Sequence, residues 1–210
     1  MSKYTTIYIE ALVLLALPIF LMTISSEVLY IRHALMAIGG IYSAWRLIKS
    51  SASFVDLGFH RSGFIESLKA LVIPSILLIL TSLFIFLVTP LPLLKVLVGY
   101  DSMPEITMIS RIIIYTFITV PVQELIFRGY ITWRIKEVYQ NPREIESISI
   151  AIFTLAHLPF HSPLILVVTF LMGLVYIKNY LKYQNIYTVI ISHAIVGAGL
   201  IMIRNAWFPF

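Results

Sequence analysis

The sequence predicts an all-α, polytopic membrane protein: a single domain, 1–210, built as a bundle of about seven transmembrane helices. Three observations support this prediction. Of the 210 residues, 60% are hydrophobic and only 12% are charged, which is about half the charged share of a soluble domain. The mean hydropathy is +0.95. Apolar runs recur along the whole chain, and because lipid cannot hydrogen-bond a backbone, we expect them to be helices. A soluble domain and a disordered chain are therefore excluded.

The first half of the chain contains three apolar runs, at 8–24, 34–47 and 70–88. No small-x-small cleavage pattern follows the first run, so we interpret it as a retained anchor rather than a signal peptide. The polar segment 49–63 is expected to be a loop with a short interfacial helix. Pro90 and Pro92 end the third run, and we expect 91–105 to be a mixed loop.

The second half contains four further apolar runs, which we predict to be transmembrane helices at 112–133, 147–162, 164–177 and 186–203. Several runs are shorter than the roughly 20 residues that cross a bilayer as a helix, so the pattern is compatible with six to eight helices. Tyr176 and Tyr187 lie near the ends of such runs. We interpret them as part of an interfacial aromatic belt.

The distribution of Lys and Arg predicts the orientation. With seven helices and a cytoplasmic N-terminus, ten of the 15 Lys and Arg residues fall on the cytoplasmic side and four outside. Cytoplasmic loops carry the excess of positive charge, so we expect an integral protein of the cell (plasma) membrane with its N-terminus in the cytoplasm. These charges are expected to contact the lipid bilayer, and no basic cluster indicates nucleic-acid binding. The chain has no cysteine, which excludes a thiolate metal site and a cysteine nucleophile.

Four ionisable residues lie inside the predicted helices: Glu124, Arg128, His157 and His193. Such groups are costly in lipid and are therefore candidates for function. Counted from the predicted helix ends at 1.5 Å per residue, Glu124 and His157 lie about 15 Å deep and His193 about 12 Å. Three helices thus bring one acid and two imidazoles to a similar depth. Depth alone leaves open whether these side chains face each other.

Glu124 and Arg128 are four residues apart, so their side chains lie on one face of the helix and can pair. A purely structural interpretation stays open, in which this pair ties two helices together and each histidine only hydrogen-bonds a neighbouring helix. Pro121 can kink the helix beside these residues.

Three motifs in this region resemble those of a known family. The stretch Pro121-Val-Gln-Glu-Leu-Ile-Phe-Arg-Gly129 resembles the Glu-Glu-x-x-x-Arg motif of the CAAX-protease and bacteriocin-processing (CPBP or Abi) family of intramembrane proteases. The stretch Phe153-Thr-Leu-Ala-His157 resembles its Phe-x-x-x-His motif. His193 corresponds to the third motif, a His followed four residues later by Asn. The resemblance covers about 112–198, which we interpret as a CPBP/Abi-like core.

This resemblance implies an all-helical membrane peptidase similar to the type II CAAX prenyl endopeptidases. It implies that His157 assists a general base that activates water and that His193 stabilises the oxyanion. It also implies that Arg128 organises the site through Glu124.

Two positions depart from the family pattern. Gln123 stands where the family has the first Glu of its pair, and a neutral amide cannot act as a general base. Gly197 stands at the position of the Asn and has no side chain that could donate a hydrogen bond to an oxyanion.

Three functions therefore stay open. The first is an endopeptidase that hydrolyses a peptide bond in a membrane-associated peptide or protein, with Glu124 acting as base beside His157. No cofactor is required for it, but in one variant Glu124, His157 and His193 bind a zinc ion. The second is a catalytically impaired relative that binds a peptide or partner in bacteriocin immunity or regulation. The third, a transporter or channel, is disfavoured because the polar groups concentrate at one depth.

Overall fold

The computed structural model describes residues 5, 9, 10, 13, 28–50, 52–98 and 107–208. Within these residues every regular element is a helix, and this confirms the predicted all-α membrane bundle. The elements are α2 (Val28–Ile48), α3 (Phe64–Val88), α4 (Leu91–Val98), α5 (Met108–Ile114), α6 (Val120–Glu124), α7 (Thr132–Lys136), α8 (Pro142–Leu155), a 3₁₀ turn (Leu158–Phe160), α9 (Pro163–Tyr183) and α10 (Ile186–Trp207).

Four of the described helices are long and apolar enough to cross a membrane: α3, the continuous helix Met108–Lys136 that includes α5 to α7, α9 and α10. A shorter apolar helix, Ala34–Ile48, forms most of α2. Each of these helices overlaps an apolar run that the sequence identified. The predicted helix at 8–24 lies almost entirely outside the described residues.

The predicted bounds of the helix at 147–162 are wrong. The observed helix, α8, begins earlier because the Asn141 side chain accepts a hydrogen bond from the Arg143 N–H and Pro142 occupies the first turn. It ends at Leu155, before the 3₁₀ turn. Its 14 residues extend about 21 Å, less than the roughly 30 Å of hydrocarbon in a bilayer. The chain therefore turns back soon after α8.

Of the two predicted loops, one contains a helix, and the other is a loop as expected but lacks the interfacial helix. The segment 91–105 contains α4, because a proline that ends one helix is equally suited to the first turn of the next, where Pro92 lies. In the other loop, the described residues 52–63 form turns instead of an interfacial helix. There the Asp56 carboxylate accepts hydrogen bonds from the backbone N–H and the hydroxyl of Ser53.

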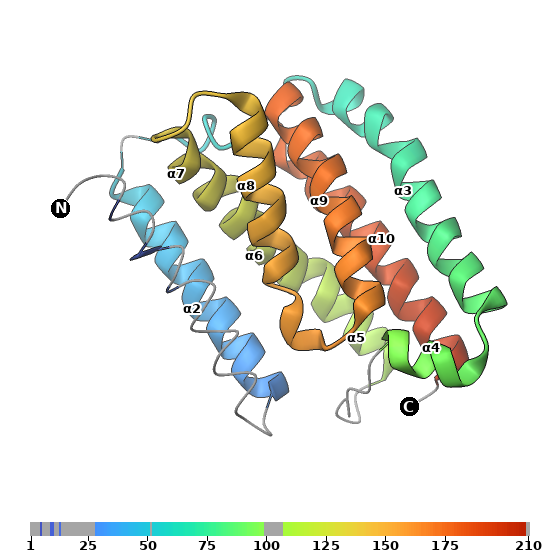
Figure 1. The fold of residues 1–210 in the computed structure, drawn as a ribbon. Coiled ribbons are helices and arrows are strands. Elements are labelled where there is room, and N and C mark those ends of the chain that lie inside the picture. The colour runs from blue at the N-terminus through green and yellow to red at the C-terminus, as the bar shows by residue number, and fades with distance from the viewer. Residues whose placement is uncertain are drawn as a thin grey trace.

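The helices pack side by side in a bundle. Figure 1 shows α3, α9 and α8 as neighbouring rods with α2 at the opposite edge from α3. Helix α3 packs on α9 and α10, and α8 packs on α9. The Met108–Lys136 helix contacts α2, α8 and α10. Polar side chains on this helix are therefore surrounded by protein on several sides.

Hydroxyl and amide side chains join α3 to α9 and α10. The Ser67 hydroxyl lies 2.7 Å from Asn179 Oδ1 on α9 and 2.6 Å from the Thr188 hydroxyl on α10. Two turns further along α3, the hydroxyls of Ser75 and Ser192 are 2.6 Å apart. Small polar residues allow close approach of helices in lipid and hydrogen-bond across them. These contacts fix α10, which carries His193, against its neighbours.

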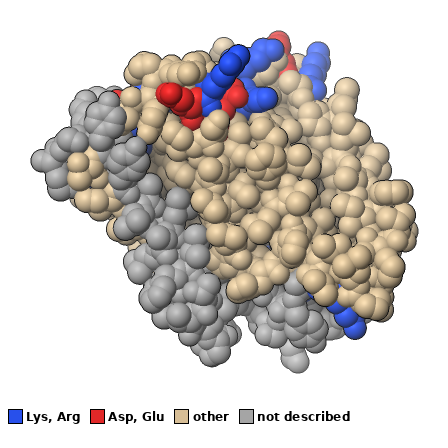
Figure 2. Space-filling view, viewed as in Figure 1, with Lys and Arg blue, Asp and Glu red and all other residues tan. Residues whose placement is uncertain are grey.

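Charged side chains gather at one end of the molecule. On the face shown in Figure 2, Lys, Arg, Asp and Glu cluster at the upper end, and the middle of the face is an uncharged band. This is the end at which α7 finishes and α8 begins (Figure 1). If the orientation predicted from the sequence holds, that end faces the cytoplasm.

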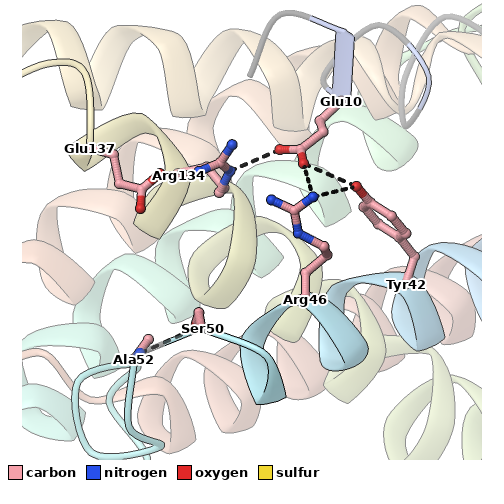
Figure 3. A network of polar contacts seen from close by, with 7 residues as sticks. All are labelled: Glu10, Tyr42, Arg46, Ser50, Ala52, Arg134 and Glu137. Atoms are coloured by element: carbon pink, nitrogen blue, oxygen red, sulfur yellow. Dashed lines mark hydrogen bonds and ion pairs between the residues drawn. The ribbon is translucent and has the colours of Figure 1, made fainter. Parts of the chain in front are cut away.

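A network of ion pairs ties Glu10 to two helices at this end (Figure 3). The Glu10 carboxylate lies 2.8 Å from Arg46 on α2 and 2.8 Å from Arg134 on α7, and it accepts a hydrogen bond from Tyr42 at 3.0 Å. Arg134 also pairs with Glu137. Glu10 belongs to the apolar run at 8–24. Its carboxylate links α2 to α7.

Candidate active site

Glu124 is the centre of the candidate site. Its side chain is fully buried, with 0% exposure, and one of its oxygens, Oε1, has two partners. Arg128 donates to Oε1 from one turn further along the same helix, at 3.2 Å. His193 of α10 places its Nδ1 2.6 Å from the same oxygen. The structure therefore brings together three of the residues that the sequence selected.

The buried guanidinium of Arg128 rests on aromatic rings. Its Cζ lies 4.0 Å from the centroid of Phe153 on α8 and 5.6 Å from that of Tyr176 on α9. A cation over the face of an aromatic ring is stabilised by the ring quadrupole. Arg128 is thus held between Glu124 and these two rings, which makes a charge in the bundle interior tolerable.

Tyr176 was assigned to an aromatic belt, and this interpretation is wrong. The side chain is fully buried, its ring centroid lies 5.7 Å from that of His193, and its hydroxyl accepts a hydrogen bond from Ser192. Helix α9 continues to Tyr183, beyond the predicted end at 177, so Tyr176 lies well inside the helix. Tyr187, by contrast, is exposed, as an interfacial residue would be.

His157 lies beside the pair instead of joining it. It follows the end of α8, with φ −100° and ψ 0°, in the sparsely populated bridge region where active-site residues often occur. Its Nδ1 is 2.8 Å from the carbonyl oxygen of Phe153, and its ring stacks on Phe160 with centroids 5.7 Å apart. The Phe153 ring lies between the two histidines, 4.9 Å from His157 and 5.8 Å from His193.

The zinc set named from the sequence is not assembled in this arrangement. Among the described residues, no group of three or more His, Asp or Glu side chains lies close enough to hold a metal ion. The nitrogen of His193 nearest to Glu124 is in contact with Oε1, and Nδ1 of His157 bonds a backbone carbonyl.

Two buried oxygens at the site have no hydrogen-bond partner among the described residues: Oε2 of Glu124 and Oε1 of Gln123. A buried polar atom without a partner is unfavourable and is often explained by function or by a bound water. Both oxygens belong to the first motif. Both could accept a hydrogen bond from a bound water or a substrate.

Gly197 meets a residue that sequence reasoning missed. A Cβ added to Gly197 would lie 2.0 Å from the hydroxyl oxygen of Tyr115, so only glycine fits here. The Tyr115 ring also contacts His193 edge-on, with centroids 6.0 Å apart. One sequence signal indicated such a residue. The family motif has an asparagine where this chain has Gly197, so another side chain was needed to fill that space.

The helix that carries Tyr115 and Glu124 is locally unwound. It has π-helical segments at Tyr115–Thr119 and Leu125–Ile131, on either side of α6. Pro121 lies between them and lacks the N–H that an α-helix would use. Single π turns inside α-helices are frequent at functional sites. The wider turns set the directions of Tyr115 and Arg128 on either side of Glu124.

The fold and the buried Glu–Arg–His cluster define a class: helical membrane proteins with an ionisable site inside the bundle. A comparison with protein families narrows this class. Residues 105–198 match the family described as type II CAAX prenyl endopeptidase Rce1-like. The match contains every residue of the site described above, and it confirms the resemblance inferred from the three motifs. No curated protein and no solved structure matched the chain.

Proposed function

We propose that the chain is an intramembrane endopeptidase that hydrolyses a peptide bond in a membrane-associated peptide or protein. The match to a protease family over residues 105–198 supports this class of activity. The observation that carries the proposal is the 2.6 Å contact between His193 Nδ1 and Glu124 Oε1 in the interior of the bundle.

The contact supports a role for His193 as the general base. A carboxylate oxygen accepts hydrogen bonds, so the imidazole donates through Nδ1, and a neutral ring then has an acceptor at Nε2. A carboxylate that fixes the tautomer and orientation of a catalytic histidine is a recurrent arrangement in hydrolases. In this scheme His193 is the general base, and Glu124 fixes its tautomer and orientation. Its own Oε2, buried and without a described partner, offers a second route in which the carboxylate takes the proton itself.

The proposed reaction uses these positions. His193 Nε2 takes a proton from water as the water oxygen bonds to the carbonyl carbon, and the carbonyl electrons move onto its oxygen. The tetrahedral oxyanion then collapses, the C–N bond breaks, and the imidazolium returns the proton to the leaving nitrogen. His157 assists by orienting the water or the substrate, and Arg128 keeps the Glu124 carboxylate in place. The products are one carboxyl and one amino terminus.

Gln123 favours a second function. Because this neutral amide replaces the acid of the family motif, the chain could be a catalytically impaired relative that binds a peptide in immunity or regulation. The buried Glu124, Arg128 and His193 would then only hold the bundle together. The two functions differ in whether new peptide ends appear.

A survey of peptide termini tests the proposal. Membranes of cells that make the native chain would be compared by mass spectrometry with membranes that carry His157→Ala or His193→Ala. Glu144→Gln, at an exposed position on α8, serves as a matched control. We expect new termini with the native chain and the control, and few or none with the histidine variants. Identical termini in all samples, with every variant folded and inserted, would refute the peptidase and leave the binding function.

A further inference from the structure

Tyr115 occupies the space above Gly197. A Cβ on Gly197 would lie 2.0 Å from the Tyr115 hydroxyl oxygen and 2.3 Å from two of its ring carbons. Gly197 follows His193 by four residues on α10, so the two positions share one face of that helix. The hydroxyl of Tyr115 therefore lies one turn along α10 from the imidazole.

The tyrosine is also in contact with the histidine. Its ring meets the His193 ring edge-on, at a centroid distance of 6.0 Å and an interplanar angle of 76°. Tyr115 is half-buried, unlike the fully enclosed Glu124. It begins the π-helical segment Tyr115–Thr119, on the same helix as Glu124. A substrate that reaches His193 from this side would meet the phenol hydroxyl.

The proposed reaction lacks an obvious donor for the oxyanion. A neutral His193 whose Nδ1 donates to Glu124 presents an acceptor at Nε2 and cannot also donate to the oxyanion. Arg128 faces Glu124 and lies on the Phe153 ring. Gly197 has no side chain. Two tyrosines contact His193. Tyr176 is fully buried and its hydroxyl is bonded by Ser192. The Tyr115 hydroxyl instead lies beside Gly197, in the space where the family motif has a side chain.

We propose that the Tyr115 hydroxyl donates a hydrogen bond to the oxyanion, which makes Tyr115 a catalytic residue. This inference rests on the proposed peptidase function. As water adds to the carbonyl carbon, negative charge develops on the carbonyl oxygen and accepts from the Tyr115 O–H. The tyrosine keeps its proton throughout, and the hydrogen bond weakens again when the C–N bond breaks. The side chain that Gly197 lacks is thus replaced from another helix.

The direct test is Tyr115→Phe, which keeps the ring against His193 and Gly197 and removes only the hydroxyl. The rate at which new peptide termini form would be measured in isolated host membranes that contain equal amounts of each variant. Loss of one oxyanion donor typically lowers the rate by about 100- to 1,000-fold. We expect a loss of that size with an unchanged unfolding temperature. Tyr187→Phe, at an exposed tyrosine on α10, is the control and should keep the native rate.

The outcomes separate this inference from the function on which it rests. If the native chain produced no new peptide termini, both the peptidase function and the role of Tyr115 would be overturned. Termini from the native chain, with the same rate in Tyr115→Phe, would overturn the role of Tyr115 and leave the peptidase standing.

A second test moves the proposed hydrogen-bond donor from position 115 to position 197. In Tyr115→Leu combined with Gly197→Asn, the shorter leucine vacates the space above position 197 and the asparagine supplies a new donor. We expect this double variant to cleave faster than Tyr115→Leu alone. A folded double variant with no gain would contradict the proposed replacement of one donor by the other.

Discussion

Removal of the Glu124–Arg128 ion pair should separate its contribution to stability from its contribution to activity. Both side chains are buried, at 0% and 2% exposure, and their charged atoms are 3.2 Å apart. Taking away one partner of such a pair leaves an uncompensated charge and destabilises by about 3–5 kcal/mol. Replacing both partners by uncharged residues of similar size is often close to neutral.

Three variants apply this reasoning: Arg128→Met, Glu124→Gln and the combination of the two. Arg128→Met leaves a buried carboxylate, so we expect a loss of about 3–5 kcal/mol. Glu124→Gln should be milder, because the amide oxygen can still accept from Arg128 and the guanidinium keeps its place on the Phe153 ring at 4.0 Å. The double variant should be more stable than Arg128→Met, with a free energy of unfolding closer to the native value.

The assay is the free energy of unfolding of each purified variant in lipid bicelles, measured beside the formation of peptide termini in membranes. We expect stability to return in the double variant while cleavage does not. If the double variant lost the sum of the two single losses, the charges would not be coupled as the structure indicates. If it recovered native cleavage together with stability, Glu124 would be structural only.

Two further predictions concern the charged end of the bundle, where α7 finishes and α8 begins. Glu10→Gln removes the charge that faces Arg134 at 2.8 Å and should lower the free energy of unfolding by about 1–3 kcal/mol; an unchanged value would show that the network has no stabilising effect. Gly58→Ala should destabilise more than Gly63→Ala: both positions have a positive φ, but only at Gly58 would a Cβ lie within 2.5 Å of a backbone oxygen, that of Gln184. Left-handed backbone alone costs about 1–2 kcal/mol, so equal losses at the two positions would contradict the predicted clash.

The fold was predictable because composition and apolar runs reflect the strongest physical constraint on the chain. A segment in lipid must satisfy its own backbone, so long apolar runs became α3, α9 and α10. The bounds of α8 were missed because its start depends on the side chain of Asn141, a polar residue that a count of apolar residues leaves out. Helix α4 was missed because Pro92 indicates equally the end of one helix and the start of another.

The candidate site was predictable for residues whose cost in lipid makes them conspicuous. Glu124, Arg128 and His193 were selected in that way and lie in contact. The i,i+4 spacing foretold the ion pair, but no spacing within one helix could show that His193 would reach Glu124 from α10. Tyr115 was missed and Tyr176 was wrongly assigned to an aromatic belt. A tyrosine is unremarkable in a membrane sequence, and only packing shows which tyrosines face the site.

The protonation of His193 tests the central claim most directly. Histidine labelled with nitrogen-15 would be introduced into the purified protein in lipid, and the ring-nitrogen signals of His193 would be assigned by their loss in His193→Gln. The account predicts a neutral ring with the proton on Nδ1, directed at Glu124, and a bare Nε2 that can accept a proton from water. A proton on Nε2 with a bare Nδ1 would contradict the Glu124–His193 pair and the mechanism built on it.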